Sequence, residues 1–314
     1  MKEKLIVIVG PTAVGKTALG VKLAKKYDGE VISGDSMQVY KGLDIGTAKI
    51  SEEEKDGIPH HLIDIIEPTE SFSVADFQQR AIPLISEINK RRKIPILVGG
   101  TGLYIHSVIK KYPLKRWEGD ETYRKQLEKL AEEKGKDYVH SLLRQVDEEA
   151  GRSIHPNNVR RVIRALEVYK LTGVPFSERQ RQERNREDVY ELAFIGLKME
   201  RQTLYERINA RVDLMMKKGL LSEVKALYDR GIRDRQAVQA IGYKELYDYF
   251  DGECSLAEAV EQIKRNTRRY AKRQYTWFRN KSNVTWFDVT NGLTEQVFSE
   301  ICTFIEGKLK IVAK

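Results

Sequence analysis

Cysteine is scarce in this chain: among 314 residues there are two, Cys254 and Cys302. Two isolated cysteines match none of the spacings that bind zinc. They also cannot form the disulfide framework that holds small secreted proteins together. The sequence therefore excludes a zinc-ribbon protein and a disulfide-rich one, and it predicts a reducing, cytoplasmic setting.

Long apolar runs are also missing. No stretch approaches the roughly eighteen consecutive apolar residues that a membrane-spanning helix needs. The apolar run at residues 5–9 is too short for the core of a signal peptide, so we expect neither a membrane span nor a leader. The chain lacks internal repeats and low-complexity segments. Its length predicts a large packed core and two structural units.

Acidic residues are fewer than basic ones, 46 against 55, which leaves a formal net charge of +9. Such an excess predicts a polyanionic partner. Residues 152–186 hold nine Arg or Lys against three Glu, and residues 262–281 hold eight and no acidic residue. The second segment is interleaved with four aromatic residues, Tyr270, Tyr275, Trp277 and Phe278. Because the bases of RNA loops can stack on aromatic rings, this composition favours RNA over duplex DNA.

The beginning of the chain holds a phosphate-binding loop. An apolar run at residues 5–9 leads into G-x-x-x-x-G-K-T, and a helical pattern follows. The backbone N–H groups of such a loop and the N-terminus of the helix attract phosphate oxygens. Lys16 adds a positive charge, and the Thr17 hydroxyl is the expected ligand of Mg²⁺. The sequence predicts that the loop binds a di- or triphosphate, nucleotides such as ATP included. The loop residues are Gly10, Pro11, Thr12, Ala13, Val14, Gly15, Lys16 and Thr17.

Strand and helix patterns alternate over the first hundred residues. This alternation predicts an α/β fold with a P-loop NTPase-like parallel sheet flanked by helices. Residues 114–190 are charged and helical in pattern, and we expect them to form an all-helical insertion domain. Residues 1–113 and 191–314 would form the α/β catalytic core, with a helical C-terminal region. The expected strands are 5–9, 30–33, 94–98, 192–197 and 284–289, and the expected helices of the first part are 16–27 and 74–92.

Polar or glycine-rich residues follow three of the expected strands: the phosphate-binding loop, residues 34–38 and residues 99–102. Because ligands bind at the carboxyl ends of parallel strands, these loops predict one common site. Asp35 could act as a general base, hold Mg²⁺ through water, or fix a turn. Thr101 could bond a substrate or cap a helix. The strand at 94–98 ends in glycine where an NTP-hydrolysing enzyme has a Walker-B aspartate, which weakens the case for phosphoryl transfer.

His60, His61 and Asp64 have the residue types of a metal site. No further Cys or His lies near them in the sequence, and adjacent histidines in a strand point to opposite faces. We therefore expect a structural or substrate-lining role and no zinc.

Seven segments, in this order, resemble those of the bacterial tRNA dimethylallyltransferases, the tRNA isopentenyltransferase family. The first four are Gly10-Pro-Thr-Ala-Val-Gly-Lys-Thr17, Ser33-Gly-Asp-Ser-Met-Gln-Val-Tyr40 with Gly46-Thr-Ala-Lys49, His60-His-Leu-Ile-Asp64 and Gly99-Gly-Thr-Gly-Leu-Tyr104. The others are Asn158-Val-Arg-Arg-Val-Ile-Arg-Ala-Leu-Glu-Val168, Ile241-Gly-Tyr-Lys-Glu245 and Thr267-Arg-Arg-Tyr-Ala-Lys-Arg-Gln-Tyr-Thr-Trp-Phe278. The zinc finger of some eukaryotic relatives is missing.

The resemblance implies transfer of a dimethylallyl group from dimethylallyl diphosphate to the exocyclic amine of the adenosine just 3′ of the anticodon in tRNA. Pyrophosphate leaves. The phosphate-binding loop would hold the prenyl diphosphate with Mg²⁺ on Thr17, and Lys16 and Arg211 would neutralise the leaving group. Asp35 would accept the proton of the amine. The implied catalytic residues are Asp35, Thr101, Lys16 and Arg211. Those implied to bind tRNA are Asp35, Ser36, Met37, Gln38, Thr101, Arg124, Asn158, Arg160, Arg161, Arg268, Lys272 and Arg273.

The helical insertion would grip the anticodon stem-loop, and we expect a monomer. Three other functions stay open. An adenylate isopentenyltransferase would run the same chemistry on free AMP, ADP or ATP, but it would not need the basic segments. A P-loop kinase of a small metabolite would turn over ATP and ignore RNA. An RNA-binding module with a degenerate loop is the third, against which the intact Gly15-Lys16-Thr17 argues.

Overall fold

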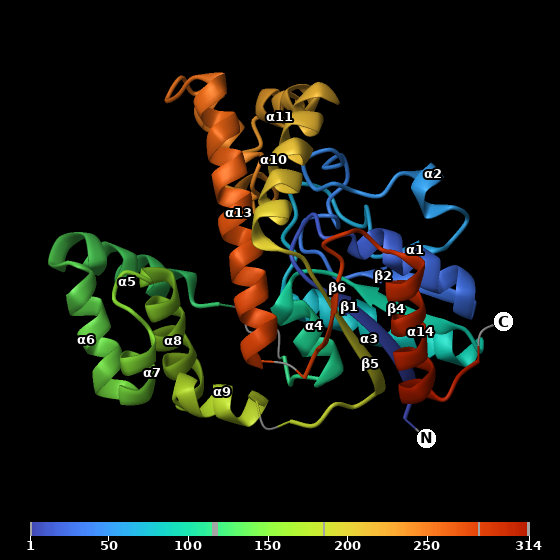
Figure 1. Cartoon of the computed structure of the whole chain (residues 1–314). Helices are drawn as coiled ribbons and strands as arrows, with labels where there is room; N and C mark the ends of the chain where they lie inside the picture. Colours follow the sequence, from blue (N-terminus) through green and yellow to red (C-terminus); the bar gives the residue numbers. More distant parts are fainter. Residues whose placement is uncertain (1, 115–118, 185, 282, 313–314) are drawn as a thin grey trace. The chain divides into compact units, whose positions relative to one another are not determined.

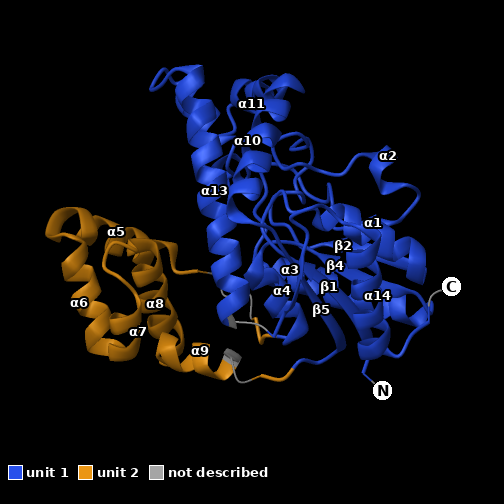
Figure 2. Ribbon diagram, viewed as in Figure 1, with its two compact units in different colours: residues 1–111, 188–314 blue, residues 112–187 orange. Residues whose placement is uncertain are grey.

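The structure is a computed structural model that describes residues 2–114, 119–184, 186–281 and 283–312 (Figure 1). It divides into two compact units (Figure 2). Unit 1 comprises residues 1–111 and 188–314, and unit 2 comprises residues 112–187. In the described part of the chain, no helix is both long and apolar enough to cross a membrane.

In its described residues, unit 1 is built around a six-stranded sheet with the order β3-β2-β4-β1-β5-β6. Every neighbouring pair of strands is parallel, which confirms the predicted α/β class. The expected strands are all present, and the two-residue strand β3 adds a sixth that the sequence pattern did not predict. The strands are β1 (Lys4–Val9), β2 (Gly29–Ser33), β3 (His60–His61), β4 (Ile94–Val98), β5 (Glu191–Lys198) and β6 (Thr285–Asp288).

The central strand β1 shows why this sheet is covered on both faces. Its residues 5–9 are all fully buried, a continuous apolar run typical of parallel strands. Leu5, Val7 and Val9 face one hydrophobic cluster, and Ile6 and Ile8 face the other. Alternate side chains of one strand thus serve two separate cores.

The first cluster is formed mainly with α3, α4, α11 and α12, and the second mainly with α1 and α14. Helix α3 begins with a capping box in which Ser73 and Asp76 bond each other's backbone N–H. The helices of unit 1 are α1 (Lys16–Tyr27), α2 (Glu52–Lys55), α3 (Val74–Lys90), α4 (Gly102–Ile109), α10 (Arg201–Lys217), α11 (Leu220–Asp229), η1 (Ala237–Gln239), α12 (Lys244–Phe250), α13 (Leu256–Lys281) and α14 (Glu295–Leu309).

The described residues of unit 2 are helical, as the charged, strand-poor sequence predicts. They enclose a small hydrophobic cluster of their own that includes Leu127, Val139 and Leu143. The helices are α5 (Glu121–Lys134), α6 (Lys136–Val146), α7 (Glu148–Ser153), α8 (Val159–Thr172) and α9 (Phe176–Arg184).

Candidate active site

The phosphate-binding loop joins β1 to α1 at the carboxyl edge of the sheet. Gly15 has a φ of 103°, a left-handed conformation that favours glycine, and it directly precedes α1. The Lys16 ammonium folds back over the loop and donates to the carbonyl oxygens of Gly10 and Pro11, at 3.0 and 2.7 Å. The loop thus has the shape and the charge to enclose a phosphate group.

Lys16 and Arg211 lie close enough for their charges to interact, although they are far apart in the sequence. Burial, and then the charge of Arg211, lower the pKa of Lys16 to about 7, while Asp35 opposes this shift. Burial and the neighbouring Arg207 also lower the pKa of Arg211. Two desolvated cations that repel one another favour an anionic ligand between them. The structure therefore brings together Lys16, Arg211 and Asp35, three of the predicted catalytic residues.

Asp35 lies on the second of the three loops at the carboxyl edge of the sheet, which comprises residues 34–38 and follows β2. The backbone N–H groups of Met37 and Gln38 donate to its Oδ1, at 2.8 and 3.3 Å. This oxygen fixes the turn, as one of the alternatives for Asp35 required. The other carboxylate oxygen, Oδ2, takes part in none of the hydrogen bonds among the described residues, so Asp35 can fix the turn and still accept a proton.

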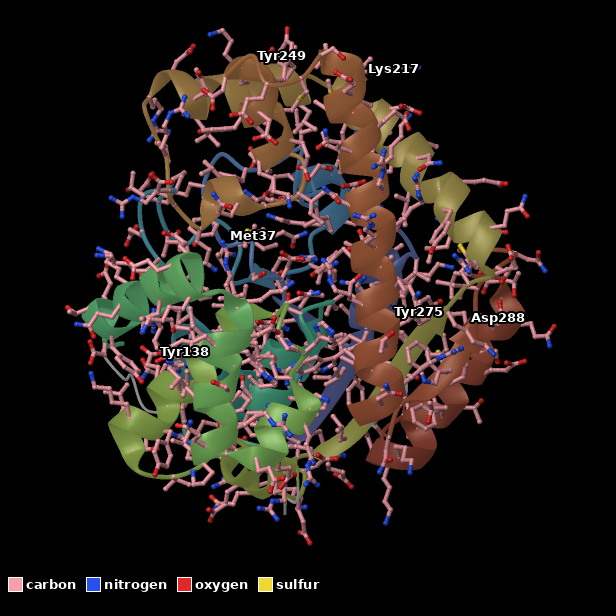
Figure 3. All side chains as sticks on the ribbon, turned by 90° about the vertical axis from the view of Figure 1, so that its left-hand side faces the viewer. Met37, Tyr138, Lys217, Tyr249, Tyr275 and Asp288 are labelled. Atoms are coloured by element: carbon pink, nitrogen blue, oxygen red, sulfur yellow. The ribbon has the colours of Figure 1, made fainter. Side chains whose placement is uncertain are left out.

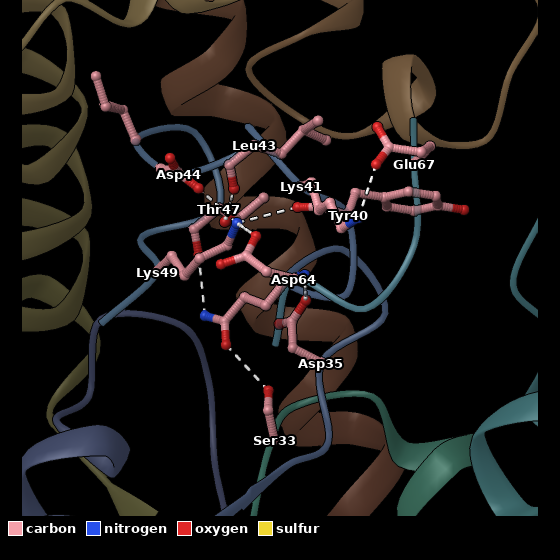
Figure 4. Close-up of polar contacts among 12 residues, drawn as sticks. Ser33, Asp35, Tyr40, Lys41, Leu43, Asp44, Thr47, Lys49, Asp64 and Glu67 are labelled. Carbon is pink, nitrogen blue, oxygen red and sulfur yellow. Dashed lines mark hydrogen bonds and ion pairs between the residues drawn. The ribbon is translucent and has the colours of Figure 1, made fainter. Parts of the chain in front are cut away.

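Gln38 holds this loop together through its side-chain amide. Its Oε1 accepts from the Ser33 hydroxyl at 3.0 Å, and its Nε2 donates to the carbonyl oxygens of Thr47 and Ala48 (Figure 4). The amide is therefore already used within the protein. The contact of Gln38 with tRNA that the resemblance implies stays a prediction. Ser36 and Met37, on the same loop, are half-buried.

The third loop, residues 99–102, places Thr101 at the N-terminus of α4. The Thr101 side chain does not cap that helix. The hydroxyl is buried and makes no hydrogen bond of good geometry with a described residue, although the Tyr270 hydroxyl lies near enough to interact with it. Burial and the charge of Asp35 raise the pKa of Tyr270 to about 12. Of the two alternatives for Thr101, this geometry speaks against helix capping, and the bond to a substrate stays a prediction.

Gln274 of α13 connects the first and third loops, a role that the sequence analysis missed. The backbone N–H of Thr12 donates to Gln274 Oε1 at 2.8 Å, and Gln274 Nε2 donates to the Gly100 carbonyl at 3.2 Å. A Cβ at Gly100 would lie 2.0 Å from Gln274 Nε2, so a larger residue there would displace the amide that connects the two loops. Gln274 lies four residues after Tyr270, so the two side chains share one face of the helix. This spacing was the feature of the sequence that could have placed Gln274 on the face of α13 turned toward the loops.

The basic residues predicted on α13 differ in their surroundings. Lys272 and Arg273 are exposed, and the Arg273 guanidinium lies 5.6 Å from the centroid of the Tyr270 ring. Arg268 instead donates to Asn209 Oδ1 at 2.6 Å and joins α13 to α10. Lys272 and Arg273 are thus the α13 side chains best placed to meet a polyanion.

A cavity of about 700 Å³ lies beside α13 in unit 1. In the view of Figure 3, two of its lining residues, Tyr275 and Asp288, lie on the same side of this helix. The basic residues that line it are Lys198, Arg201, Lys272 and Arg279. Of its acidic residues, Asp288 accepts bonds from the N–H and hydroxyl of Thr290, and Glu200 accepts them from Thr203. With four basic and two acidic residues, the lining of the cavity carries a net positive charge, and two of the basic residues, Lys272 and Arg279, belong to α13.

In unit 2, Arg160 and Arg161 are exposed on the first turn of α8, after the exposed Asn158. Arg124 has another role. Its Nε donates to Glu167 Oε1 at 2.7 Å, and Glu167 has no solvent exposure. A buried carboxylate requires a cationic partner of this kind, so Arg124 stabilises unit 2. The contact of Arg124 with tRNA stays a prediction.

The two histidines and Asp64 have structural partners. His61 Nε2 lies 2.8 Å from the buried carboxylate of Glu30, and Asp64 pairs with Lys49. The ring of His60 bonds the Ile58 carbonyl at 2.8 Å through Nδ1. These contacts support the structural role that the sequence predicted for this cluster.

Comparisons with known proteins give consistent results. A model of the IPP transferase family matches residues 38–281. The tRNA dimethylallyltransferase of Halalkalibacterium halodurans is 60% identical over 314 residues, with 100% of both chains covered. That of Bacillus cereus strain Q1 is 59% identical over 310 residues, with 99% of this chain and 96% of the relative covered.

Solved structures agree. The full-length tRNA isopentenylpyrophosphate transferase from Bacillus halodurans has a TM-score of 0.76 and 59% identity, and the match covers 98% of this chain and 97% of that one. A eukaryotic dimethylallyltransferase acting on tRNA has a TM-score of 0.74 and 32% identity, with 91% of this chain and 74% of that one covered.

Proposed function

The chain belongs to the IPP transferase family, and we propose that its site joins the dimethylallyl group of dimethylallyl diphosphate to the exocyclic amine of the adenosine just 3′ of the anticodon. The chain is an enzyme that modifies adenosine in tRNA with a dimethylallyl group. The observation that carries the proposed mechanism is the position of Lys16 and Asp35 on the loops that follow strands β1 and β2, where the charges of both Asp35 and Arg211 act on Lys16.

The phosphate-binding loop would hold the diphosphate. Oxygens of the ligand would replace the two carbonyls that the Lys16 ammonium now contacts. Lys16 and Arg211 would then stabilise the negative charge that develops on the leaving pyrophosphate, an interaction stronger in the transition state than in the ground state.

Mg²⁺ fits the residues present. The Thr17 side chain is exposed at the start of α1, and Mg²⁺ in nucleotide sites commonly takes one or two protein oxygens besides phosphate and water. Thr17 would hold the ion, which when bound neutralises diphosphate oxygens.

Asp35 would act on the adenine side of the site. The exocyclic amine is a poor nucleophile, because its lone pair is delocalised into the ring. As its nitrogen bonds to the dimethylallyl carbon and the carbon–oxygen bond to diphosphate breaks, Asp35 would take the proton that the amine loses. The buried Thr101 hydroxyl would bond the adenine and hold it in line.

The exposed basic residues would bind the tRNA phosphates. Arg160 and Arg161 in unit 2, and Lys272 and Arg273 in unit 1, meet the requirements for contacts that position an RNA backbone. A free nucleotide offers no use for these four cations, which counts against the adenylate reaction. We propose that the enzyme acts as a monomer in the cytoplasm, where its tRNA substrate is found.

A transfer assay tests this function. Radiolabelled dimethylallyl diphosphate and Mg²⁺ are incubated with unmodified tRNA in one reaction and with AMP in another. We expect label in the tRNA alone. Label in AMP would support the free-nucleotide alternative, and label in neither would overturn the prenyl transfer.

Replacing Arg160 by Ala should weaken tRNA binding and reduce the salt slope of log K by about one, since one phosphate contact is lost. Filter binding at several salt concentrations measures both. Arg152→Ala is the matched control, because Arg152 lies in the same unit but pairs with Glu148. An unchanged slope in Arg160→Ala would remove this contact from the proposal.

The affinity for dimethylallyl diphosphate should fall as the pH rises above about 7, where the Lys16 pKa lies in the ligand-free protein. A bound diphosphate favours the charged ammonium, so binding above this pH takes up one proton. We expect the dissociation constant to rise up to about tenfold per pH unit between about pH 7.5 and 9. Calorimetric titration measures it. The dependence should disappear in Lys16→Arg, whose guanidinium keeps its charge, and an equal slope there would refute the assignment to Lys16.

A further inference from the structure

The loop that carries Asp35 is long and irregular. Residues 34–50, which follow β2, contain turns and bends but no helix or strand. Backbone hydrogen bonds join residues 38–41 of this segment to residues 64–66, and the rest of the loop keeps one conformation only if side chains hold it. The position of Asp35 therefore depends on the groups that bind this loop.

Lys49 supplies one support from within the loop. Its side chain is only 5% exposed and forms ion pairs with Asp44 and Asp64. The same ammonium donates to the Tyr40 carbonyl at 3.0 Å (Figure 4). With the Gln38 amide, Lys49 ties the two halves of the loop together.

Glu223 of α11 supplies a second support from outside the loop. The backbone N–H groups of Asp44 and Ile45 donate to Glu223 Oε2 at 2.9 and 2.7 Å. The N–H of Gly46 and the hydroxyl of Tyr243 donate to Oε1 at 3.0 and 2.6 Å. Three successive N–H groups that converge on one carboxylate resemble the nests that bind anions.

Tyr243 completes this support. Its side chain is fully buried, and its ring lies so close to Gly46 that a Cβ there would approach it to 2.5 Å. The fit leaves the loop little room to shift while the Glu223 carboxylate is in place.

We propose that Glu223 is a positioning residue for the transfer reaction: by binding residues 44–46 it fixes the loop that presents Asp35, without touching a substrate. The connection runs through hydrogen bonds within the loop. Gln38 bonds the carbonyls of Thr47 and Ala48, and its own N–H bonds Asp35. The inference rests on the proposed role of Asp35 in proton transfer.

The expected effect is large because proton transfer requires exact distances. A displacement of about 1 Å at a reacting group can cost roughly a hundredfold in rate. Glu223→Gln places an amide NH₂ where two donors now meet a carboxylate oxygen, either the N–H groups of residues 44 and 45 or the N–H of Gly46 and the Tyr243 hydroxyl, so that part of the nest loses its acceptor. We expect kcat to fall by about ten- to a hundredfold. KM for dimethylallyl diphosphate should stay within about threefold, because the diphosphate binds on a different loop.

A double-mutant cycle tests the proposal. Glu223→Gln is made in the wild-type enzyme and in Asp35→Ala, and single-turnover rates are measured with saturating tRNA and dimethylallyl diphosphate. If Glu223 acts through Asp35, its replacement in Asp35→Ala should change the residual rate less than about twofold. Asp229→Asn is the control, since this exposed acid on the same helix pairs only with Lys225 among the described residues.

Two results would overturn the proposal: a normal kcat in Glu223→Gln, or an equal loss in both backgrounds. If Glu223→Gln does not fold, Tyr243→Phe is the second variant, because it removes one of the four hydrogen bonds to the Glu223 carboxylate. It should lower kcat a few-fold in the wild-type enzyme and leave the residual rate of Asp35→Ala unchanged. A wild-type enzyme that transfers no label at all would instead refute the proposed function.

Discussion

Asp35→Ala should lose most of its dimethylallyl transfer while it still binds tRNA. Removing a general base typically costs about 10²- to 10⁴-fold in rate. The adenine amine would keep its proton during attack, whereas the exposed arginines that we propose contact the tRNA backbone are unchanged. Single-turnover rates measure the first effect, and filter binding measures the second.

The companion variant Asp35→Asn separates the two roles of this side chain. Its amide oxygen can still accept from Met37 and Gln38 and preserve the turn, but it cannot take a proton. Both variants should therefore lose activity to a similar extent. An active Asp35→Asn would show that Asp35 serves only the turn.

Lys16→Ala should lower kcat/KM for dimethylallyl diphosphate by about 10²- to 10³-fold, the typical cost of removing one group that stabilises developing negative charge. Arg211 would be the one of the two cationic side chains left to neutralise the leaving pyrophosphate, beside the Mg²⁺ that Thr17 would hold. Binding of tRNA should not change, because Lys16 lies on the loop that we propose holds the diphosphate.

Lys22→Ala is the control for this variant, because Lys22 lies on the same helix but pairs with Glu295 on the surface. It should retain full activity. Transfer within a few-fold of wild type in Lys16→Ala would contradict the assignment of the diphosphate to this loop.

The parts of the fold that the sequence predicted are those set by local pattern. The apolar run of β1 and the glycine–lysine spacing after it specify a strand, a loop and a helix within about twenty residues. The rule that ligands bind at the carboxyl ends of parallel strands then brought Lys16, Asp35 and Thr101 to one edge. β3 escaped detection, because two residues carry no periodicity.

The supports of the site were not predictable, because they are contacts between distant segments. Gln274 meets Thr12 across 262 residues, and Glu223 meets Asp44 across 179. Nothing in the sequence near either residue specifies the partner. Arg124 illustrates the same limit: the sequence shows an arginine, but only the packing shows that it faces the buried Glu167.

Locating the added group on the tRNA tests the central claim most directly. Wild-type enzyme is incubated with dimethylallyl diphosphate and unmodified tRNA, and the product is digested with nucleases and examined by mass spectrometry. We predict one dimethylallyl group, on the exocyclic amine of the adenosine just 3′ of the anticodon, and none on a tRNA with guanosine there. A dimethylallyl group at another position, or on the guanosine tRNA, would contradict the account.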